Sequence, residues 1–347
     1  MQNHAIRFLN TSLNAFAKRL WQITATSLIA LCIYLPSIQA GTMPENAKVI
    51  LDEDGDRIRA EFNIMVNNIG TPYDIASAFV LPGQEVRIAI TFTRRQAPIS
   101  LKDLSTGAST PFEQQTVWTA PDAPGLYPLS IENESHKVLL NVFVKTPREK
   151  AVKGKIGFYR IGEYPKPKEI KNKTLYVVPD GYIEVTEQNK DTRLSPSFTL
   201  GEFTSKQSTK FPKYVYLRET LLLKLELIKQ ELNLQGIKAE RMVVMSGYRT
   251  PFYNRNIGNV KFSRHVFGDA ADIFVDNDSD YYMDDLNKDG KRNIKDARLL
   301  ANIIEELEKR EAYKPFIGGL GIYGKKPHRG PFVHVDTRGY KARWTKP

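Results

Sequence analysis

The distribution of apolar and polar residues divides the chain into a β-rich half and a half that mixes helices with strands. In residues 86–92 apolar side chains alternate with polar ones, and residues 138–144 repeat this period of two. Such a period places one face of a strand in a core and the other in solvent. Turn-forming residues at 120–125 precede a further predicted strand at 126–131. Short strands joined by such turns predict an all-β domain over residues 41–148.

Helical periodicity begins in the second half. Residues 221–232 and 300–307 place leucine and isoleucine three or four positions apart, which predicts helices with one buried face. Short apolar stretches predict three strands, at residues 242–245, 319–323 and 332–336. This pattern favours an α+β domain with an antiparallel sheet over residues 195–347, preceded by a β-sandwich of the immunoglobulin type. Residues 149–194, rich in Lys, Pro and Gly, are interpreted as a connector that packs against it.

The first forty residues have the composition of a secretory signal peptide. They contain no Asp or Glu, basic residues precede an apolar run from Leu20 to Leu35, and Ala40 stands at the expected cleavage point. This run is shorter than the roughly 20 residues that a membrane span needs. The single Cys, Cys32, lies in this segment, so the sequence predicts neither disulfides nor a cysteine-based zinc site in the mature chain. We therefore expect a periplasmic or secreted protein without membrane contact beyond the signal; an uncleaved anchor is the alternative.

The composition excludes several classes of protein. Hydrophobic residues make up 41% of the chain and charged residues 26%, which is typical of a folded globular protein rather than a disordered or polytopic membrane protein. Fifty Lys and Arg against 39 Asp and Glu give a net charge of +11, which favours anionic partners. The sequence contains no nucleic-acid-reading motif. Nucleic acid is therefore not an expected partner, whereas an anionic cell-wall polymer is.

A histidine and an aspartate stand seven positions apart in the second half. Gly268, Ala270 and Ala271 are among the residues that separate His265 from Asp272, and His334 lies far downstream in a predicted strand. Two His and one carboxylate are a known ligand set of catalytic zinc, with the fourth position open to water. Taken alone the pair is a weak signal, because unrelated histidines and a surface aspartate would look the same. The sequence has no His-Glu-x-x-His, which excludes the common helix-borne arrangement.

Four short motifs follow one another around these residues. They are Ser246-Gly247-Tyr248-Arg249-Thr250, Ser-x-His-x-x-Gly-x-Ala-x-Asp from Ser263 to Asp272, Gly-Gly-Leu-Gly-x-Tyr at 318–323, and Phe332-Val333-His334-Val335-Asp336. This order resembles the zinc D-Ala-D-Ala metallopeptidases, peptidoglycan hydrolases that share their fold with lysostaphin and the hedgehog signalling domain. The resemblance covers roughly residues 195–347 and is nearest to the murein endopeptidase branch.

The resemblance implies roles for five residues. His265, Asp272 and His334 would bind one catalytic Zn²⁺. Arg249 would stabilise the oxyanion of a tetrahedral intermediate, as a fixed positive charge can. Ser263 would hydrogen-bond the substrate or the metal ligands.

The general base is less well defined by the same comparison. Many family members place Glu or Asp three residues before the last histidine, where this chain has Pro331. Asp336 is the first candidate for the base, or for a carboxylate that orients a metal ligand, because residues two apart on a strand share a face. His328 is the second candidate for the base. A purely structural role for Asp336 is the remaining alternative.

A second metal motif occupies residues 285–296. Oxygen donors stand at positions 1, 3, 5, 9 and 12 of this loop, and Gly290 provides the turn at position 6, as in calcium-binding loops. The expected ligands are Asp285, Asn287, Asp289, Asn293 and Asp296, with Lys291 through its backbone carbonyl. We expect a structural Ca²⁺ within an insert at 276–296, and a solvated acidic turn is the alternative.

The sequence as a whole predicts an exported zinc peptidase that hydrolyses peptidoglycan stem-peptide or cross-link amide bonds. A D-Ala-D-Ala carboxypeptidase is one alternative, and a cell-wall binding protein that keeps the fold without hydrolysis is another. Arg249 beside an intact ligand set argues against the binding protein, and Pro331 argues weakly for it. The expected partners are peptidoglycan and, through the β-sandwich, other envelope components.

Overall fold

The structure, a computed structural model, describes residues 62–93, 97–166 and 175–347, which belong to one compact unit. The predicted signal segment, residues 1–40, lies outside the described residues. None of the helices in the described ranges has both the length and the apolar character needed to cross a bilayer.

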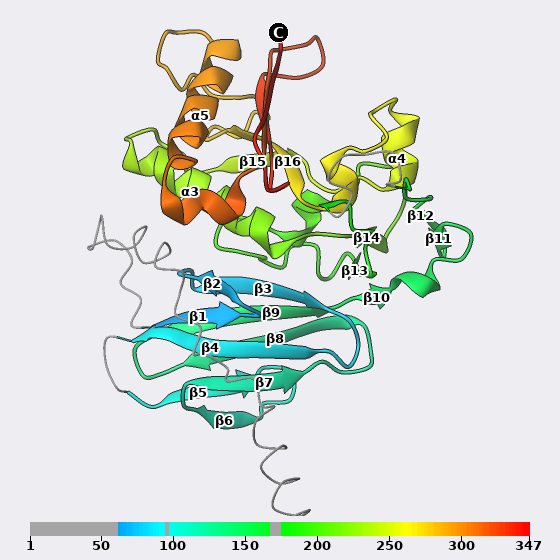
Figure 1. Cartoon of the computed structure of the whole chain (residues 1–347), viewed down its shortest axis with the longest axis vertical. Coiled ribbons are helices and arrows are strands. Elements are labelled where there is room, and N and C mark those ends of the chain that lie inside the picture. Colours follow the sequence, from blue (N-terminus) through cyan, green and yellow to red (C-terminus); the bar gives the residue numbers. More distant parts are fainter. Residues whose placement is uncertain (1–61, 94–96, 167–174) are drawn as a thin grey trace, which may run out of the picture. The chain divides into compact units, whose positions relative to one another are not determined.

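Residues 62–144 form two β-sheets (Figure 1). The first contains, in spatial order, β2 (Ile69–Thr71), β1 (Phe62–Val66), β4 (Glu85–Thr93) and β7 (Gln115–Thr119). The second contains β3 (Ile75–Val80), β9 (Lys137–Val144), β8 (Gly125–Glu132), β5 (Ile99–Asp103) and β6 (Ser109–Phe112). Ile64 and Ile88 from the first sheet and Leu140 from the second are fully buried in one shared core. The strands predicted from alternation are confirmed, and the immunoglobulin type of the sandwich stays a prediction.

The segment interpreted as a connector contributes strands of its own. A three-stranded sheet contains β10 (Thr146–Pro147), β13 (Gly181–Val185) and β14 (Lys213–Val215), and a hairpin contains β11 (Lys155–Ile156) and β12 (Tyr159–Arg160). Tyr182 and Ile183 on β13 are buried in the same hydrophobic cluster as the helices that follow. The connector is therefore joined to the C-terminal part by both strand pairing and core packing.

A five-stranded sheet forms the centre of the C-terminal part. Its spatial order is β15 (Met242–Ser246), β16 (Ala270–Val275), β18 (Phe332–Asp336), β17 (Gly319–Tyr323) and β19 (Ala342–Lys346). The first three neighbouring pairs are antiparallel, as expected. The expectation of an entirely antiparallel sheet is wrong at one edge, because β19 pairs in parallel with β17. β18 ends at Asp336 and β19 begins at Ala342, which pairs with Gly319 at the same end of the sheet, so β19 runs opposite to β18 and parallel to β17.

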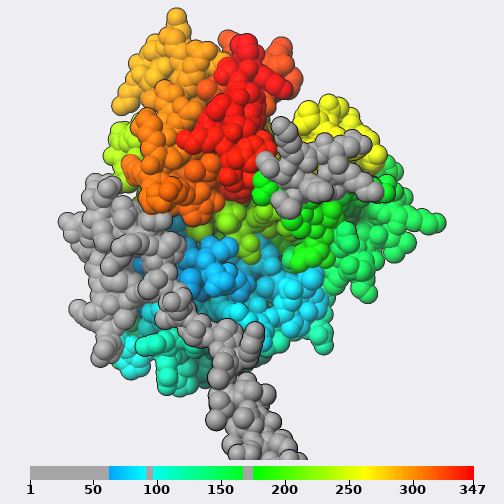
Figure 2. All heavy atoms as spheres, in the orientation of Figure 1, coloured from blue at the N-terminus to red at the C-terminus, as the bar shows by residue number. Residues whose placement is uncertain are grey.

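Helices complete this α+β arrangement. They are α3 (Glu219–Leu234), α4 (Pro251–Asn256) and α5 (Ile294–Leu307), with the short 3₁₀ helices η1 (Arg148–Lys150), η4 (Leu200–Phe203), η5 (Arg264–Phe267) and η6 (Glu311–Phe316). The predicted stripes of α3 and α5 are buried, including Leu221, Leu225, Leu300 and Ile304. Helix α5 contacts α3, β17 and β18. Figure 2 accordingly shows the orange residues of α5 beside the red C-terminal strands.

Candidate metal centre

His265 is held by the turn that connects η5 to β16. Its Nδ1 donates a hydrogen bond to the Gly247 carbonyl oxygen at 2.7 Å, so the other ring nitrogen, Nε2, faces the site. Gly268 ends η5 with a φ of 69°, in the left-handed region that glycine adopts without strain. A Cβ at this position would lie 2.6 Å from the Tyr216 carbonyl oxygen. Glycine is therefore required for the chain to turn between His265 and the strand that carries Asp272.

Strand pairing brings the other two predicted ligands together. Asp272 on β16 lies directly opposite His334 on β18 in the antiparallel register. Residues directly opposite each other on one face of a sheet have neighbouring side chains. His334 therefore reaches Asp272 although 62 residues separate them along the chain.

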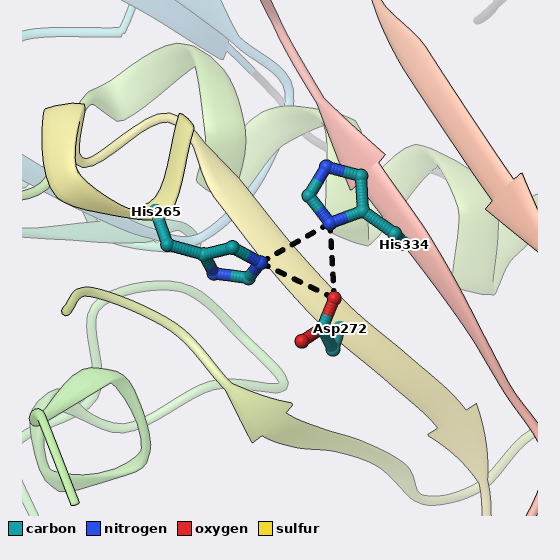
Figure 3. A group of neighbouring side chains, drawn as sticks. All are labelled: His265, Asp272 and His334. Atoms are coloured by element: carbon teal, nitrogen blue, oxygen red, sulfur yellow. Dashed lines mark hydrogen bonds and ion pairs between the residues drawn. The ribbon is translucent and has the colours of Figure 1, made fainter. Parts of the chain in front are cut away.

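The three ligating atoms form a compact triangle. His265 Nε2 lies 3.2 Å from Asp272 Oδ1 and 3.1 Å from His334 Nδ1, and His334 Nδ1 lies 2.9 Å from Asp272 Oδ1. Figure 3 shows the three side chains pointing toward one another from the η5 turn and the two strands. Tetrahedral zinc with bonds of about 2.0–2.1 Å holds its ligand atoms roughly 3.3 Å apart. The donor set and its spacing therefore fit a zinc ion bound on three protein ligands.

The electrostatics of the site suit a cation. Burial lowers the pKa of His265 to about 4, so its ring is neutral near pH 7 and Nε2 offers a lone pair. Burial raises the pKa of Asp272, but the neighbouring histidines and Arg249 outweigh this effect and hold the pKa well below its usual value. Asp272 is therefore an anion that faces a neutral His265. Burial lowers the pKa of His334, but its hydrogen bonds to Asp272 and Asp336 outweigh this effect and raise the pKa, so a metal ion at Nδ1 would displace a proton from this ring.

Asp336 lies on the far side of His334 from the metal ligands. Its Oδ2 is 3.2 Å from His334 Nε2, whereas His334 Nδ1 faces Asp272 and His265. The same carboxylate is fully buried and accepts hydrogen bonds from the Gly319 backbone N–H and the Arg338 side chain. Of the roles predicted for Asp336, this geometry favours orientation of a metal ligand over proton transfer at the metal.

Arg249 contacts the metal site directly. Its Nη2 donates to Asp272 Oδ2 at 2.6 Å, and its Nε donates to Ser246 Oγ at 2.9 Å. The guanidinium is thus fixed next to a ligand, where its charge can also stabilise negative charge that develops on a bound carbonyl oxygen.

The structure places the other two predicted site residues differently. Ser263 precedes η5 and is largely buried, but within the described part of the chain its hydroxyl forms no hydrogen bond to the metal ligands. His328 is exposed in the loop between β17 and β18. It stays a candidate for the general base.

The predicted calcium loop is ordered by its own backbone. Asp285 accepts hydrogen bonds from the N–H groups of Asp289 and Gly290, and Asp296 accepts them from Leu286 and Asn293. Among the described residues, the groups of His and acidic side chains close enough to share a metal are the zinc triad and Asp276, Asp278 and Asp284. The carboxylates of the predicted calcium ligands do not form a further group, so calcium binding stays a prediction.

Sequence reasoning missed several residues that shape the site. Arg338 buttresses Asp336, and the Trp344 ring lies 5.1 Å from the His334 ring. Gly321 makes room for this indole, because a Cβ there would lie 2.3 Å from the Trp344 ring. The Asp-x-Arg spacing at 336–338 was the available signal for Arg338. The position of Trp344 beside His334 results from the parallel pairing of β19 with β17, which no local sequence pattern indicated.

Comparison with known proteins bears on the class of reaction, independently of the geometry of the site. Residues 197–292 match the family model described as Peptidase M15, a zinc-dependent family of peptidases. The matched segment contains Arg249, His265 and Asp272, and the fold supplies His334 from beyond it. Searches of the curated proteins and of the solved structures returned no match. The match supports a hydrolase of the peptidase class.

Proposed function

We propose that the protein is an exported zinc endopeptidase that hydrolyses amide bonds in peptidoglycan stem peptides or their cross-links. The observation that carries this proposal is the triangle of His265, Asp272 and His334, with sides of 2.9–3.2 Å, beside the Arg249 guanidinium. The match of residues 197–292 to a peptidase family supports the reaction class. The signal-like segment and the basic charge support an envelope location and an anionic cell-wall substrate.

The chain's own residues prepare the site for amide hydrolysis. Zinc bound at this position supplies Lewis acidity toward an amide carbonyl and toward water. His265 and His334 each have their second ring nitrogen occupied, by the Gly247 carbonyl and by Asp336, which fixes the tautomer that faces the ion. Arg249 holds Asp272 in place and puts a positive charge where the carbonyl oxygen becomes negative.

A structural calcium ion in the loop at residues 285–296 belongs to the same proposal. The oxygen donors occupy the positions that a calcium loop uses, and Gly290 has the positive φ of its turn, 76°. The loop leads directly into α5, where Asn293 and Asp296 cap the first turn. An ion there would fix the start of the helix that packs against β17 and β18.

The test of the proposed function combines metal analysis with product identification. Purified protein is expected to contain one zinc per chain, and to convert cross-linked peptidoglycan dimers to monomers that mass spectrometry identifies. His265→Ala is the control and is expected to lose both the metal and the activity. Release of only a terminal D-Ala would instead identify a carboxypeptidase. Bound zinc without any product would contradict the peptidase function and favour the cell-wall binding protein.

If the protein is active, the His328→Gln variant tests whether His328 is the general base. Loss of activity in this variant with zinc still bound would support that role.

A further inference from the structure

A stacked pair of aromatic rings and an arginine that contacts both stand next to the metal ligands. The Tyr323 and Phe332 rings are stacked, with centroids 4.4 Å apart and an interplanar angle of 8°. The Arg329 guanidinium carbon lies 4.6 Å from the Phe332 ring centroid and 5.9 Å from that of Tyr323. A guanidinium over an aromatic face is held by cation–π attraction while its edge stays available for hydrogen bonds.

The strand register puts this stack on the face of the sheet that carries the metal ligands. Tyr323 lies opposite Phe332, and Gly321 lies opposite His334. Phe332 and His334 are two residues apart on β18, so they share a face and are separated by roughly 7 Å along the strand. An extended peptide advances about 3.3–3.6 Å per residue, so a substrate held at the metal reaches the stack within two residues of its scissile bond.

The Arg329 side chain is anchored without being neutralised. Its Nη1 donates to the carbonyl oxygens of Gly324 at 2.8 Å and Gly330 at 3.2 Å. Within the described residues no carboxylate forms an ion pair with Arg329, and its Nε and Nη2 groups have no hydrogen-bond partner. Burial lowers the pKa of Arg329, and the nearby charge of Asp272 only partly opposes this effect. A half-buried cation that lacks a counter-ion is a favourable place for an anion.

Neighbouring side chains rigidify the stack and add to its positive charge. Trp344 Nε1 donates to the Tyr323 hydroxyl at 2.9 Å, which ties the stack to the indole beside His334. The Lys346 ammonium lies 5.7 Å from the Tyr323 ring centroid. Two cations therefore flank the aromatic pair, and the orientation of the rings is fixed before a ligand arrives.

We propose that Arg329, supported by the Phe332–Tyr323 stack, binds a carboxylate of the substrate within two residues of the scissile bond. The proposal rests on the proposed peptidase function. The free edge of the guanidinium, Nε and Nη2, matches the two oxygens of a carboxylate. Such a carboxylate has two sources in stem peptides: the terminal D-Ala of a pentapeptide, or the carboxylate beside the acylated amine of a cross-linking diamino acid.

The experiment compares peptides that differ only in this charge. Zinc-loaded protein is given a pentapeptide ending in D-Ala-D-Ala and a cross-linked dimer, each with the carboxylate free or converted to a carboxamide. Wild type is expected to favour the free carboxylate in kcat/KM by about 10- to 100-fold, the range of a charge-assisted hydrogen bond. Arg329→Gln keeps a donor for the Gly324 carbonyl. This variant is expected to lose the preference, with a kcat/KM for the amidated peptide within about twofold of the wild-type value. The peptide for which the carboxylate preference depends on Arg329 identifies which of the two carboxylates is bound.

Matched variants and a binding measurement make the outcome decisive. Lys325→Ala removes an exposed charge from the same loop and is expected to keep the preference, whereas Arg329→Lys is expected to keep only part of it. An equal decrease in kcat/KM for the free and amidated peptides in Arg329→Gln would overturn the proposal. If wild type cleaves neither peptide, the peptidase function fails by itself, and calorimetry of peptide binding then decides the subsite. An affinity that depends on both the substrate carboxylate and Arg329 supports the proposed subsite. No binding, or equal affinity for the free and amidated peptides, overturns it.

Discussion

At the scale of single residues, the site depends on groups that orient the metal ligands as much as on the ligands themselves. Asp336 touches His334 through the nitrogen that faces away from the metal, and Arg338 and the Gly319 N–H hold that carboxylate. Hydrogen bonds of this kind fix the tautomer and the ring plane of a ligating histidine and increase its basicity. Asp336 would thus contribute to metal affinity through His334, without contacting the metal itself.

Asp336→Asn is expected to weaken zinc affinity by about 10- to 100-fold, because the amide is a poorer partner for His334. Competition with a chromophoric chelator measures this loss. Asp269→Asn is the matched control, since Asp269 is another fully buried carboxylate, paired with Arg264 rather than with a metal ligand. An equal loss in both variants would show that Asp336 acts only through general stability.

At the scale of elements, α3 carries a buried lysine that connects it to the end of β18. Lys224 is fully buried, and its Nζ donates to the carbonyl oxygens of Phe316 at 2.8 Å and Asp336 at 2.9 Å. Glu308 Oε1 lies 3.9 Å away. Burial lowers the pKa of Lys224 to about 8, although nearby acids oppose the shift.

This shift predicts a pH dependence of stability. An unfolded lysine titrates near 10.4, so between pH 8 and 10.4 the unfolded chain binds more protons than the folded one. The unfolding free energy contributed by Lys224 therefore rises with pH in this window, on the order of 2 kcal/mol. Urea unfolding at pH 8 and 9.5 is expected to show this rise in wild type and to lack it in Lys224→Met. Lys229→Met, on the same helix, is the control, and an identical pH dependence in all three proteins would contradict the prediction.

The loop before α5 provides a second test at this scale. With zinc present, a calcium-selective chelator is expected to lower the Tm, at roughly 2–4 °C for each kcal/mol of lost stability. Asp285→Ala is expected to abolish the response to calcium. Asp278→Ala, in the neighbouring acidic group, is expected to retain it. If Asp278→Ala instead loses the change in Tm, the calcium ion is bound by that neighbouring acidic group. If the Tm of the wild type does not change, calcium binding is excluded.

At the scale of the whole molecule, the metal ligands join segments that are distant along the chain. His265 comes from η5, Asp272 from β16 and His334 from β18. An unfolded chain does not hold these three atoms together, so a zinc ion held by them would bind the native state selectively.

Zinc is therefore expected to stabilise the fold by about 2.7 kcal/mol at a free concentration of 100 Kd and by about 4.1 kcal/mol at 1,000 Kd. Thermal unfolding with and without a zinc-selective chelator measures the difference. His265→Ala is expected to melt at the same temperature in both conditions. A wild-type Tm that does not respond to the chelator would contradict a metal bound by these residues.

The amino-acid sequence was sufficient to predict the features that depend on local pattern. Alternation located β4 and β9, helical spacing located α3 and α5, and short apolar stretches located β17 and β18. The family resemblance predicted His265, Asp272 and His334 as zinc ligands, because His265 and Asp272 stand in one motif of the family and His334 in another. Side-chain period and motif spacing are properties of neighbouring residues, so they can be read without a fold.

Contacts between residues that are distant along the chain became visible only in the folded structure. The register of β16 against β18 places Asp272 opposite His334. Asp336 contacts the Nε2 atom of His334, and this contact favours a role in orienting the ligand over a role in proton transfer. The parallel pairing of β19 brings Trp344 to His334, and the loop before β18 lays Arg329 over Phe332. These contacts depend on how strands pair and chain segments close on one another, which local periodicity does not encode.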